Sequence, residues 1–191
     1  MIKIGILGDI GSGKTFVANQ FGYPVFNADI EVSKIYKKNK NCFKLLKKNF
    51  PNQIFSFPIK KSEISKLILL DEKNLKKLNK IVHPIVRIRM NRFINRNKKK
   101  KIIILDIPLL LENKIKKKDL TLVFVDAKRN EIIKNLKKRK NYNSKIVKLL
   151  KKFQLSLDYK KKVSNFIVKN DFKMKPVKKS VKLIKTKILY K

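Results

Sequence analysis

A lysine and a hydroxyl side chain close a glycine-rich run near the start of the chain. Residues 8–15 read GDIGSGKT and match the pattern G-x-x-x-x-G-K-[ST] at every fixed position. Glycines let the backbone curl until successive N–H groups point at phosphate oxygens, beside the positive end of the following helix. Lys14 then offers a charge to the β- and γ-phosphates of a nucleotide, and the Thr15 hydroxyl can ligate Mg²⁺. A plain glycine-rich turn would not need the Lys-Thr pair, so we predict a phosphate-binding loop.

Two acidic residues follow short apolar runs that are typical of buried strands. Asp29 comes after residues 25–28, and Asp106 comes after residues 102–105. Ligands on a parallel sheet bind beyond the carboxyl ends of its strands, so both acids are candidates for a site there. A kinase needs a carboxylate to accept the proton of the attacking hydroxyl and another to hold Mg²⁺ directly or through water. We predict that Asp106 is the acid on the metal side. The alternative for either acid is a helix N-cap, and for Asp29 the capped helix would start near Ile30.

Three further polar residues have weaker signals. His83 is the only histidine, and it precedes Pro84 at the expected start of a helix with its apolar face at Val86 and Met90. One histidine cannot form a metal site, so from the residues alone a structural role is favoured. Glu112 follows an apolar turn and is typical of a helix start. Asp9 is unexpected beside bound phosphates because its charge would repel them, and we expect its side chain to point away.

Apolar runs alternate with helical patterns along the chain. We predict strands at residues 2–7, 25–27, 102–105, 121–125 and 166–168. Strands that alternate with helices form a parallel α/β sheet. Residues 30–80 interrupt the alternation and are expected to be a helical insertion, while the cation-rich residues 128–162 are expected to be a mobile flap. The core would then comprise residues 1–29, 81–127 and 163–191.

Composition limits the class of protein. The net charge is +38, with 51 Lys and Arg against 13 Asp and Glu. Such a charge attracts polyanions, which would indicate a nucleic-acid partner. An AT-rich genome would also produce this composition, with lysines spread from end to end, many Ile, Asn and Phe, and few Gly. We favour this second explanation. The single cysteine, Cys42, permits no internal disulfide, and no apolar run reaches the length of a membrane span, about 18 residues. We expect a soluble cytoplasmic monomer, with lysine clusters such as residues 98–101, 116–118 and 160–162 at exposed turns or helix ends.

Several motifs together resemble dephospho-CoA kinases. The residues that carry the resemblance are GDIGSGKTFVA (8–18), NAD (27–29), LNKIVHP (78–84), LDIPLLLE (105–112), LKKR (136–139), Gln154, Lys160 and IVKN (167–170). The resemblance spans nearly the whole chain. The phosphate loop is shared with many kinases, whereas the combination of NAD, HP and PLL-x-E is far more specific. It changes the expectation for His83 from a structural residue to a site residue.

The resemblance implies a phosphate-loop kinase fold: a parallel five-stranded sheet flanked by helices, with a helical substrate-binding insertion and a helical lid. It implies transfer of the ATP γ-phosphate to the ribose 3′-hydroxyl of dephospho-CoA with Mg²⁺ as the metal. Asp29 would be the general base, Lys14 and Arg139 would serve catalysis, and Thr15 and Asp106 would face the metal. The ATP-binding residues would be Gly8, Gly11, Ser12, Gly13, Lys14, Thr15 and Phe16. The acceptor would be bound by His83, Pro108 and Glu112.

This sequence departs from the family pattern at four places. Asn27 stands where the family has the first acid of DAD, and Asp9 stands where the loop normally has glycine. A second lid arginine would fall on Leu150, with Lys151 beside it as a candidate replacement, although a lysine is no planar bidentate clamp. Residues 164–165 replace the usual Ala-Asp before the last strand.

Two other functions remain open from the sequence alone. Another small-molecule or nucleoside monophosphate kinase would share the loop, but it should lack the HP and PLL-x-E motifs. A basic nucleic-acid-associated protein would need aromatic residues interleaved with cations or a recognition helix, and neither stands out. We therefore expect small-molecule partners, with no specific nucleic acid and no membrane.

Overall fold

The computed structural model describes residues 1–112, 119–139 and 142–190. Its contacts divide the chain into two compact units. The first unit comprises Met1–Asn27, Asn97–Asn143 and Lys151–Lys191, and the second comprises Ala28–Arg96 and Ser144–Leu150. Each unit is described separately below. Among the described residues, no helix is both long enough and apolar enough to cross a membrane.

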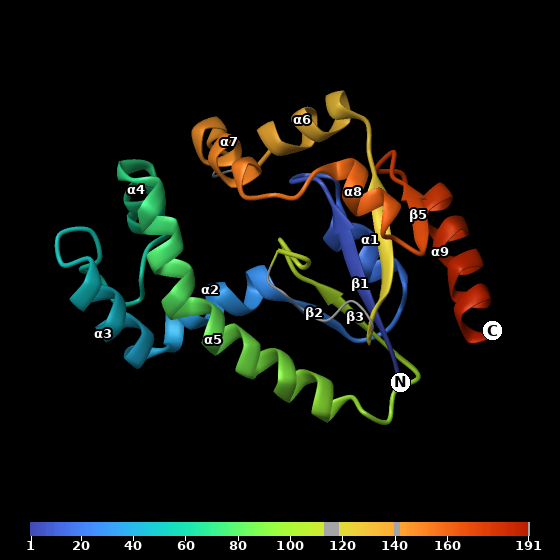
Figure 1. Ribbon diagram of the computed structural model, residues 1–191, viewed down its shortest axis with the longest axis horizontal. Helices are drawn as coiled ribbons and strands as arrows, with labels where there is room; N and C mark the ends of the chain where they lie inside the picture. The colour runs from blue at the N-terminus through green and yellow to red at the C-terminus, as the bar shows by residue number, and fades with distance from the viewer. Residues whose placement is uncertain (113–118, 140–141, 191) are drawn as a thin grey trace. The chain divides into compact units, whose positions relative to one another are not determined.

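The first unit is built on a parallel sheet of five strands. The strands are β1 (Ile2–Gly8), β2 (Val25–Asn27), β3 (Ile102–Asp106), β4 (Thr121–Asp126) and β5 (Phe166–Lys169). Their order in the sheet is β2-β3-β1-β4-β5, with β1 between β3 and β4 (Figure 1). All four pairings are parallel, so the carboxyl ends of the strands share one edge. The predicted strands and the predicted parallel sheet are confirmed.

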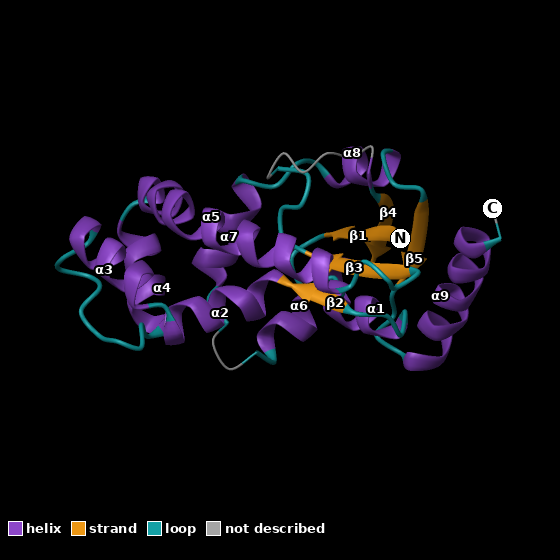
Figure 2. Cartoon of the chain, turned by 90° about the horizontal axis from the view of Figure 1, so that it is seen from below, coloured by secondary structure: helices purple, strands orange, loops and turns teal. Residues whose placement is uncertain are grey.

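Helices cover both faces of this sheet, which explains why its central strands β3, β1 and β4 are buried along most of their length. Every residue of β3 is buried. The helices α1 (Lys14–Gln20) and α9 (Met174–Leu189) pack together with the sheet, and α8 (Leu157–Lys162) contacts β1 from the other side (Figure 2). The core between α1, α9 and the sheet consists of Ile4, Ile6, Val17, Ala18, Phe21, Ile102, Ile104, Val123, Val125, Val168, Val177, Val181 and Ile184. The first unit also contains α6 (Arg129–Lys137).

The second unit is a group of helices around α5 (Glu72–Arg96). The helices α2 (Ala28–Lys38), α3 (Lys40–Asn49) and α4 (Lys61–Leu70) each contact α5. Most of α7 (Ser144–Lys152) is grouped with this unit, whereas its Lys151 and the residues after it are grouped with the first. Cys42 is buried in α3, and burial raises the pKa of its thiol to about 11. The predicted bounds of core, insertion and lid stay a prediction.

The expected start of a helix at His83 and Pro84 is wrong, because α5 begins at Glu72 and passes through both residues. A proline lacks the N–H that would donate to the carbonyl four residues earlier, so it is favoured only in the first turn of a helix. Here the apolar stripe continues backwards through Leu75, Leu78 and Val82, all buried. Packing of this stripe outweighs the loss of one helical hydrogen bond.

The lysine clusters differ from one another. Residues 98–101 lie exposed in the turn before β3, as predicted. Residues 116–118 lie outside the described part of the chain. Residues 160–162 lie in the last turn of α8, at a helix end as predicted, although the side chain of Lys160 is only 3% exposed and its ammonium contacts the Glu112 carboxylate.

Candidate active site

The phosphate loop joins β1 to α1 at the carboxyl edge of the sheet. Gly11 and Gly13 both have φ of +85°, in the left-handed region that side chains with a Cβ rarely adopt. Space is also short at both positions, since a Cβ on Gly11 would lie 2.7 Å from the Leu136 side chain and one on Gly13 would overlap the amide of Asn170. That amide donates a hydrogen bond of 2.8 Å to the carbonyl of Ser12. The loop is therefore held in a curled conformation by its glycines and by the segment after β5.

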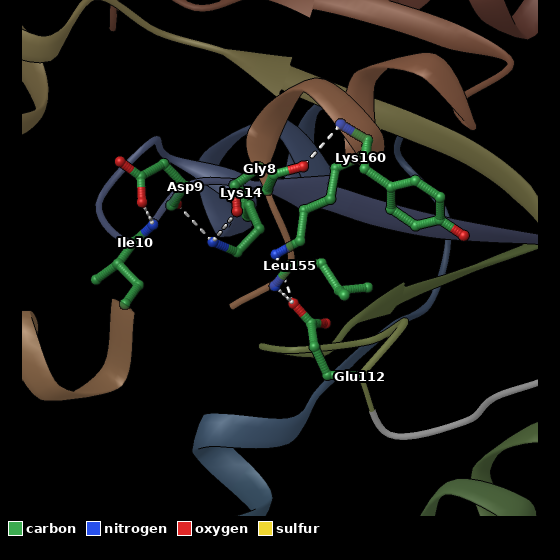
Figure 3. Close-up of polar contacts among 9 residues, drawn as sticks. Gly8, Asp9, Ile10, Lys14, Glu112, Leu155 and Lys160 are labelled. Atoms are coloured by element: carbon green, nitrogen blue, oxygen red, sulfur yellow. Dashed lines mark hydrogen bonds and ion pairs between the residues drawn. The ribbon is translucent and has the colours of Figure 1, made fainter. Parts of the chain in front are cut away.

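Lys14 folds back over this loop. Its ammonium donates to the carbonyl oxygens of Asp9 at 2.8 Å and Gly8 at 3.3 Å (Figure 3). The hydroxyl of Ser12 is buried and has no hydrogen-bond partner within the described residues. A buried hydroxyl without a partner costs free energy, which a bound phosphate oxygen would offset. The loop thus has donors suited to an anion.

Thr15 and Asp106 meet at the end of β3. The Thr15 hydroxyl donates to Asp106 Oδ2 at 2.5 Å, and the Asn27 amide donates to the same oxygen at 2.6 Å. Strand register explains the convergence, because Asn27 of β2 lies directly opposite Asp106 of β3. Burial raises the pKa of Asp106, while the hydrogen bond from Thr15, the charge of Lys14 and the hydrogen bond from Asn27 act in the opposite direction. These three contacts support a carboxylate that burial alone would disfavour.

A hydroxyl and a carboxylate are hard oxygen ligands of the kind that Mg²⁺ prefers, usually one or two from the protein with the rest from water and phosphate. The contact between Thr15 and Asp106 therefore fits one Mg²⁺ held jointly with a nucleotide. Within the described ranges, no group of three or more His, Cys, Asp and Glu residues is arranged so that it could hold a metal ion by itself.

Glu112 is held in the turn that follows β3. Its Oε1 accepts a salt bridge of 2.8 Å from Lys160 and a hydrogen bond of 2.9 Å from the backbone N–H of Leu155 (Figure 3). Its Oε2 is also buried and has no partner among the residues described. Glu112 thus links the turn that follows β3 to Leu155 and to Lys160 of α8.

Comparison with known proteins decides the family. The family model for dephospho-CoA kinase matches residues 2–175. The chain belongs to the dephospho-CoA kinase family. The dephospho-CoA kinase of Wolbachia pipientis wMel is 36% identical over 170 residues, which make up 86% of this chain and 87% of that one. The dephospho-CoA kinase of Bartonella henselae is 32% identical over the same coverage of both chains.

Solved structures share the fold of this chain. A Thermus thermophilus protein aligns over 97% of both chains with a TM-score of 0.78 and 26% identity. A dephospho-CoA kinase from Campylobacter jejuni aligns over 97% of this chain and 96% of its own with a TM-score of 0.64, and at 19% identity this likeness shows the fold alone. The predicted phosphate-loop kinase fold and the predicted family are confirmed.

The residues assigned from the dephospho-CoA kinase pattern fall in both units. The loop residues, Asp106, Pro108, Glu112 and Arg139 belong to the first unit, whereas Asp29 and His83 belong to the second. Asp29 lies exposed in the first turn of α2, whose first residue is Ala28, so the alternative of an N-cap before Ile30 is wrong. Phe16 packs against the core of the first unit. Arg139 is exposed just after α6.

Sequence reasoning missed two polar contacts of this dephospho-CoA kinase family member. It treated Asn27 only as a departure from an acid, although its position at the end of a strand, like that of Asp106, could have indicated a shared site. The expectation that the Asp9 side chain points away from bound phosphates stays a prediction. The structure adds that Asp9 Oδ1 accepts the N–H of Ile10 at 2.6 Å and that Oδ2 accepts a hydrogen bond from Lys151 at 2.9 Å. Nothing in the local sequence indicates that second contact, which joins residues far apart in the chain.

Proposed function

We propose that this protein transfers the γ-phosphate of ATP to the ribose 3′-hydroxyl of dephospho-CoA and so produces coenzyme A. The family match over residues 2–175 carries the proposal, because it covers the phosphate loop as well as the HP and PLL-x-E motifs. The geometry of the loop supports the nucleotide half of the reaction. Mg²⁺ as the metal, a cytoplasmic location and a monomeric state are parts of the same proposal.

The phosphate loop binds and orients ATP. Its N–H groups and the N-terminus of α1 surround the phosphates, and Lys14 moves from the carbonyls of Gly8 and Asp9 to the β- and γ-phosphate oxygens. This exchange is favourable because a phosphate oxygen carries charge and a carbonyl oxygen does not. Loop residues Gly11, Ser12, Gly13 and Phe16 complete the ATP-binding set.

Thr15 and Asp106 hold the metal side. When bound, Mg²⁺ neutralises charge on the phosphate oxygens during transfer. The Thr15 hydroxyl and the Asp106 carboxylate would hold it, and the amide of Asn27 keeps Asp106 oriented.

Asp29 accepts the proton of the attacking 3′-hydroxyl, and Arg139 stabilises the charge on the transferred phosphoryl group. Asp29 is exposed, so its carboxylate is accessible to a substrate hydroxyl. His83, Pro108 and Glu112 bind the acceptor. These roles rest on the family pattern residue by residue.

The test is ADP release from ATP and Mg²⁺ with dephospho-CoA as the acceptor, beside a panel of nucleoside monophosphates. We expect turnover with dephospho-CoA alone and a product phosphorylated at the ribose 3′ position by mass spectrometry and NMR. Turnover only with another acceptor would overturn the substrate while keeping the kinase. Retention on DNA without turnover on any acceptor would favour the nucleic-acid alternative.

A further inference from the structure

Asp9 places a carboxylate inside the phosphate loop, where ATP will bring three more negative groups. Its side chain is only 12% exposed, and all of its oxygens accept hydrogen bonds. Oδ1 accepts from the N–H of Ile10, Oδ2 from Lys151, and the carbonyl oxygen from both Ser12 and Lys14. Asp9 is therefore a fixed part of the loop, and its charge has to be balanced there.

Lys151 provides that balance from a distant part of the chain. It lies in the last turn of α7, 142 residues from Asp9, and its ammonium lies 2.9 Å from Asp9 Oδ2. Its side chain is 45% exposed. An ammonium has three N–H donors and the contact with Asp9 uses one, so the exposed side of Lys151 can donate to an anion without releasing Asp9.

Asp9 is contacted by two ammonium groups. Lys14 contacts its carbonyl oxygen at 2.8 Å, and Lys151 contacts its carboxylate at 2.9 Å. Two cations gathered at one residue repel each other, and the negative charge of the Asp9 carboxylate reduces this repulsion. Lys14 leaves the Asp9 carbonyl when it binds the β- and γ-phosphates, whereas the carboxylate of Asp9 keeps the ammonium of Lys151 beside the loop that the phosphates enter.

We propose that Lys151 binds the γ-phosphate of ATP and that Asp9 is a positioning residue that holds it for this task. The inference rests on the proposed use of ATP and extends it to two residues that the usual pattern does not supply. In place of an arginine that could bind phosphate through two N–H groups, this chain has the ammonium of Lys151, which the carboxylate of Asp9 holds in position. An ordinary surface ion pair would behave differently, because its removal would leave nucleotide affinity unchanged.

Nucleotide binding tests the role of Lys151 without any acceptor. Isothermal titration with Mg²⁺ would compare ADP with a non-hydrolysable ATP analogue for wild type, Lys151→Met, Lys151→Arg and Lys148→Met. Lys148 lies exposed on the same helix, so its variant has the same net charge as Lys151→Met. We expect Lys151→Met to weaken binding of the ATP analogue about tenfold and binding of ADP less than about threefold, because only the analogue has a γ-phosphate. Lys151→Arg should stay close to wild type, and so should Lys148→Met. An equal effect of Lys151→Met and Lys148→Met, or an equal loss for both nucleotides, would overturn the inference.

The positioning role of Asp9 is tested by a double-mutant cycle. Asp9→Asn keeps an oxygen for the N–H of Ile10 but removes the charge that aims Lys151. We expect weaker binding of the ATP analogue in the wild-type background and stronger binding in the Lys151→Met background, where the carboxylate is left to repel phosphate. Effects that simply add would overturn the role of Asp9. Circular dichroism of each variant checks the fold.

These experiments separate this inference from the proposed function. If Lys151→Met lowers affinity for the ATP analogue selectively but dephospho-CoA is not phosphorylated, the acceptor is wrong and the phosphate contact stands. If dephospho-CoA is phosphorylated at equal KM for ATP by wild type and Lys151→Met, the function stands and the phosphate contact is wrong.

Discussion

The amide of Asn27 and the hydroxyl of Thr15 donate to one and the same oxygen, Oδ2 of Asp106, at 2.6 and 2.5 Å. Most family members have an acid at the position of Asn27, as the resemblance implies, so this chain has one negative charge fewer at its metal side. The amide makes the arrangement stable before any metal arrives, because it donates where a carboxylate would repel.

Asn27→Asp tests this relationship. The substitution removes a donor and places two carboxylates within hydrogen-bond distance, so we expect the free energy of unfolding at pH 7 without Mg²⁺ to fall by about 1–3 kcal/mol. Millimolar Mg²⁺ should recover more stability in the variant than in wild type, because the added carboxylate is a further oxygen ligand. Urea unfolding with and without Mg²⁺ measures both effects. An unchanged free energy in the absence of metal would contradict the importance of the Asn27 hydrogen bond.

Asp29→Asn separates chemistry from nucleotide binding. If Asp29 is the general base, kcat with dephospho-CoA should fall by about 10²–10⁴ while affinity for ATP stays within about twofold. Lys14→Ala is the matched comparison, and it should weaken both ATP binding and turnover. Single-turnover kinetics and equilibrium titration measure the two quantities. A rate near that of wild type in Asp29→Asn would remove this residue from the mechanism.

Lys160→Met tests the buried salt bridge with Glu112. The substitution leaves the Glu112 carboxylate without its cation in a site where the lysine is 3% exposed, so we expect a loss of about 3–5 kcal/mol in the free energy of unfolding. The neighbouring Lys161→Met breaks the exposed pair with Asp126 and should cost less than about 1 kcal/mol.

Urea denaturation of both lysine variants gives the comparison. The double variant Lys160→Met/Glu112→Gln should be more stable than Lys160→Met alone, because it no longer buries an unpaired charge. Equal losses for Lys160→Met and Lys161→Met would show that the buried pair contributes no more than a surface one.

His83 gives stability a dependence on pH. Burial, and secondarily the charge of Arg87, lowers the pKa of His83 in the folded protein. A lowered folded-state pKa contributes stability that is fully present above the unfolded-state value of about 6.5 and is lost as the pH falls through the folded-state value. Wild type should therefore lose more stability than His83→Gln when the pH falls from about 8 to about 5. Parallel stability curves for the two proteins over this range would contradict the burial of His83.

The order of the elements and the phosphate loop were predictable from the sequence because both depend on local chemistry. Five apolar runs of strand length indicated the five strands. The loop at residues 8–15 adopts its curled backbone because Gly11 and Gly13 permit positive φ angles. The sequence predicted the start of this helix near Pro84, whereas α5 begins twelve residues earlier, at Glu72. A proline is a local signal, but the buried stripe through Leu75 and Leu78 depends on tertiary packing.

Only the tertiary structure decided which polar groups meet. Asn27 and Asp106 become neighbours because β2 pairs with β3 in that register, a choice among several sheet orders that the runs alone allow. Lys151 contacts Asp9 and Lys160 contacts Glu112 across long stretches of chain, and in a sequence with 51 cations no pattern indicates which carboxylate each of these two lysines contacts. Local propensity determines elements, whereas the pairing of charges depends on how those elements pack, and packing is a property of the whole chain.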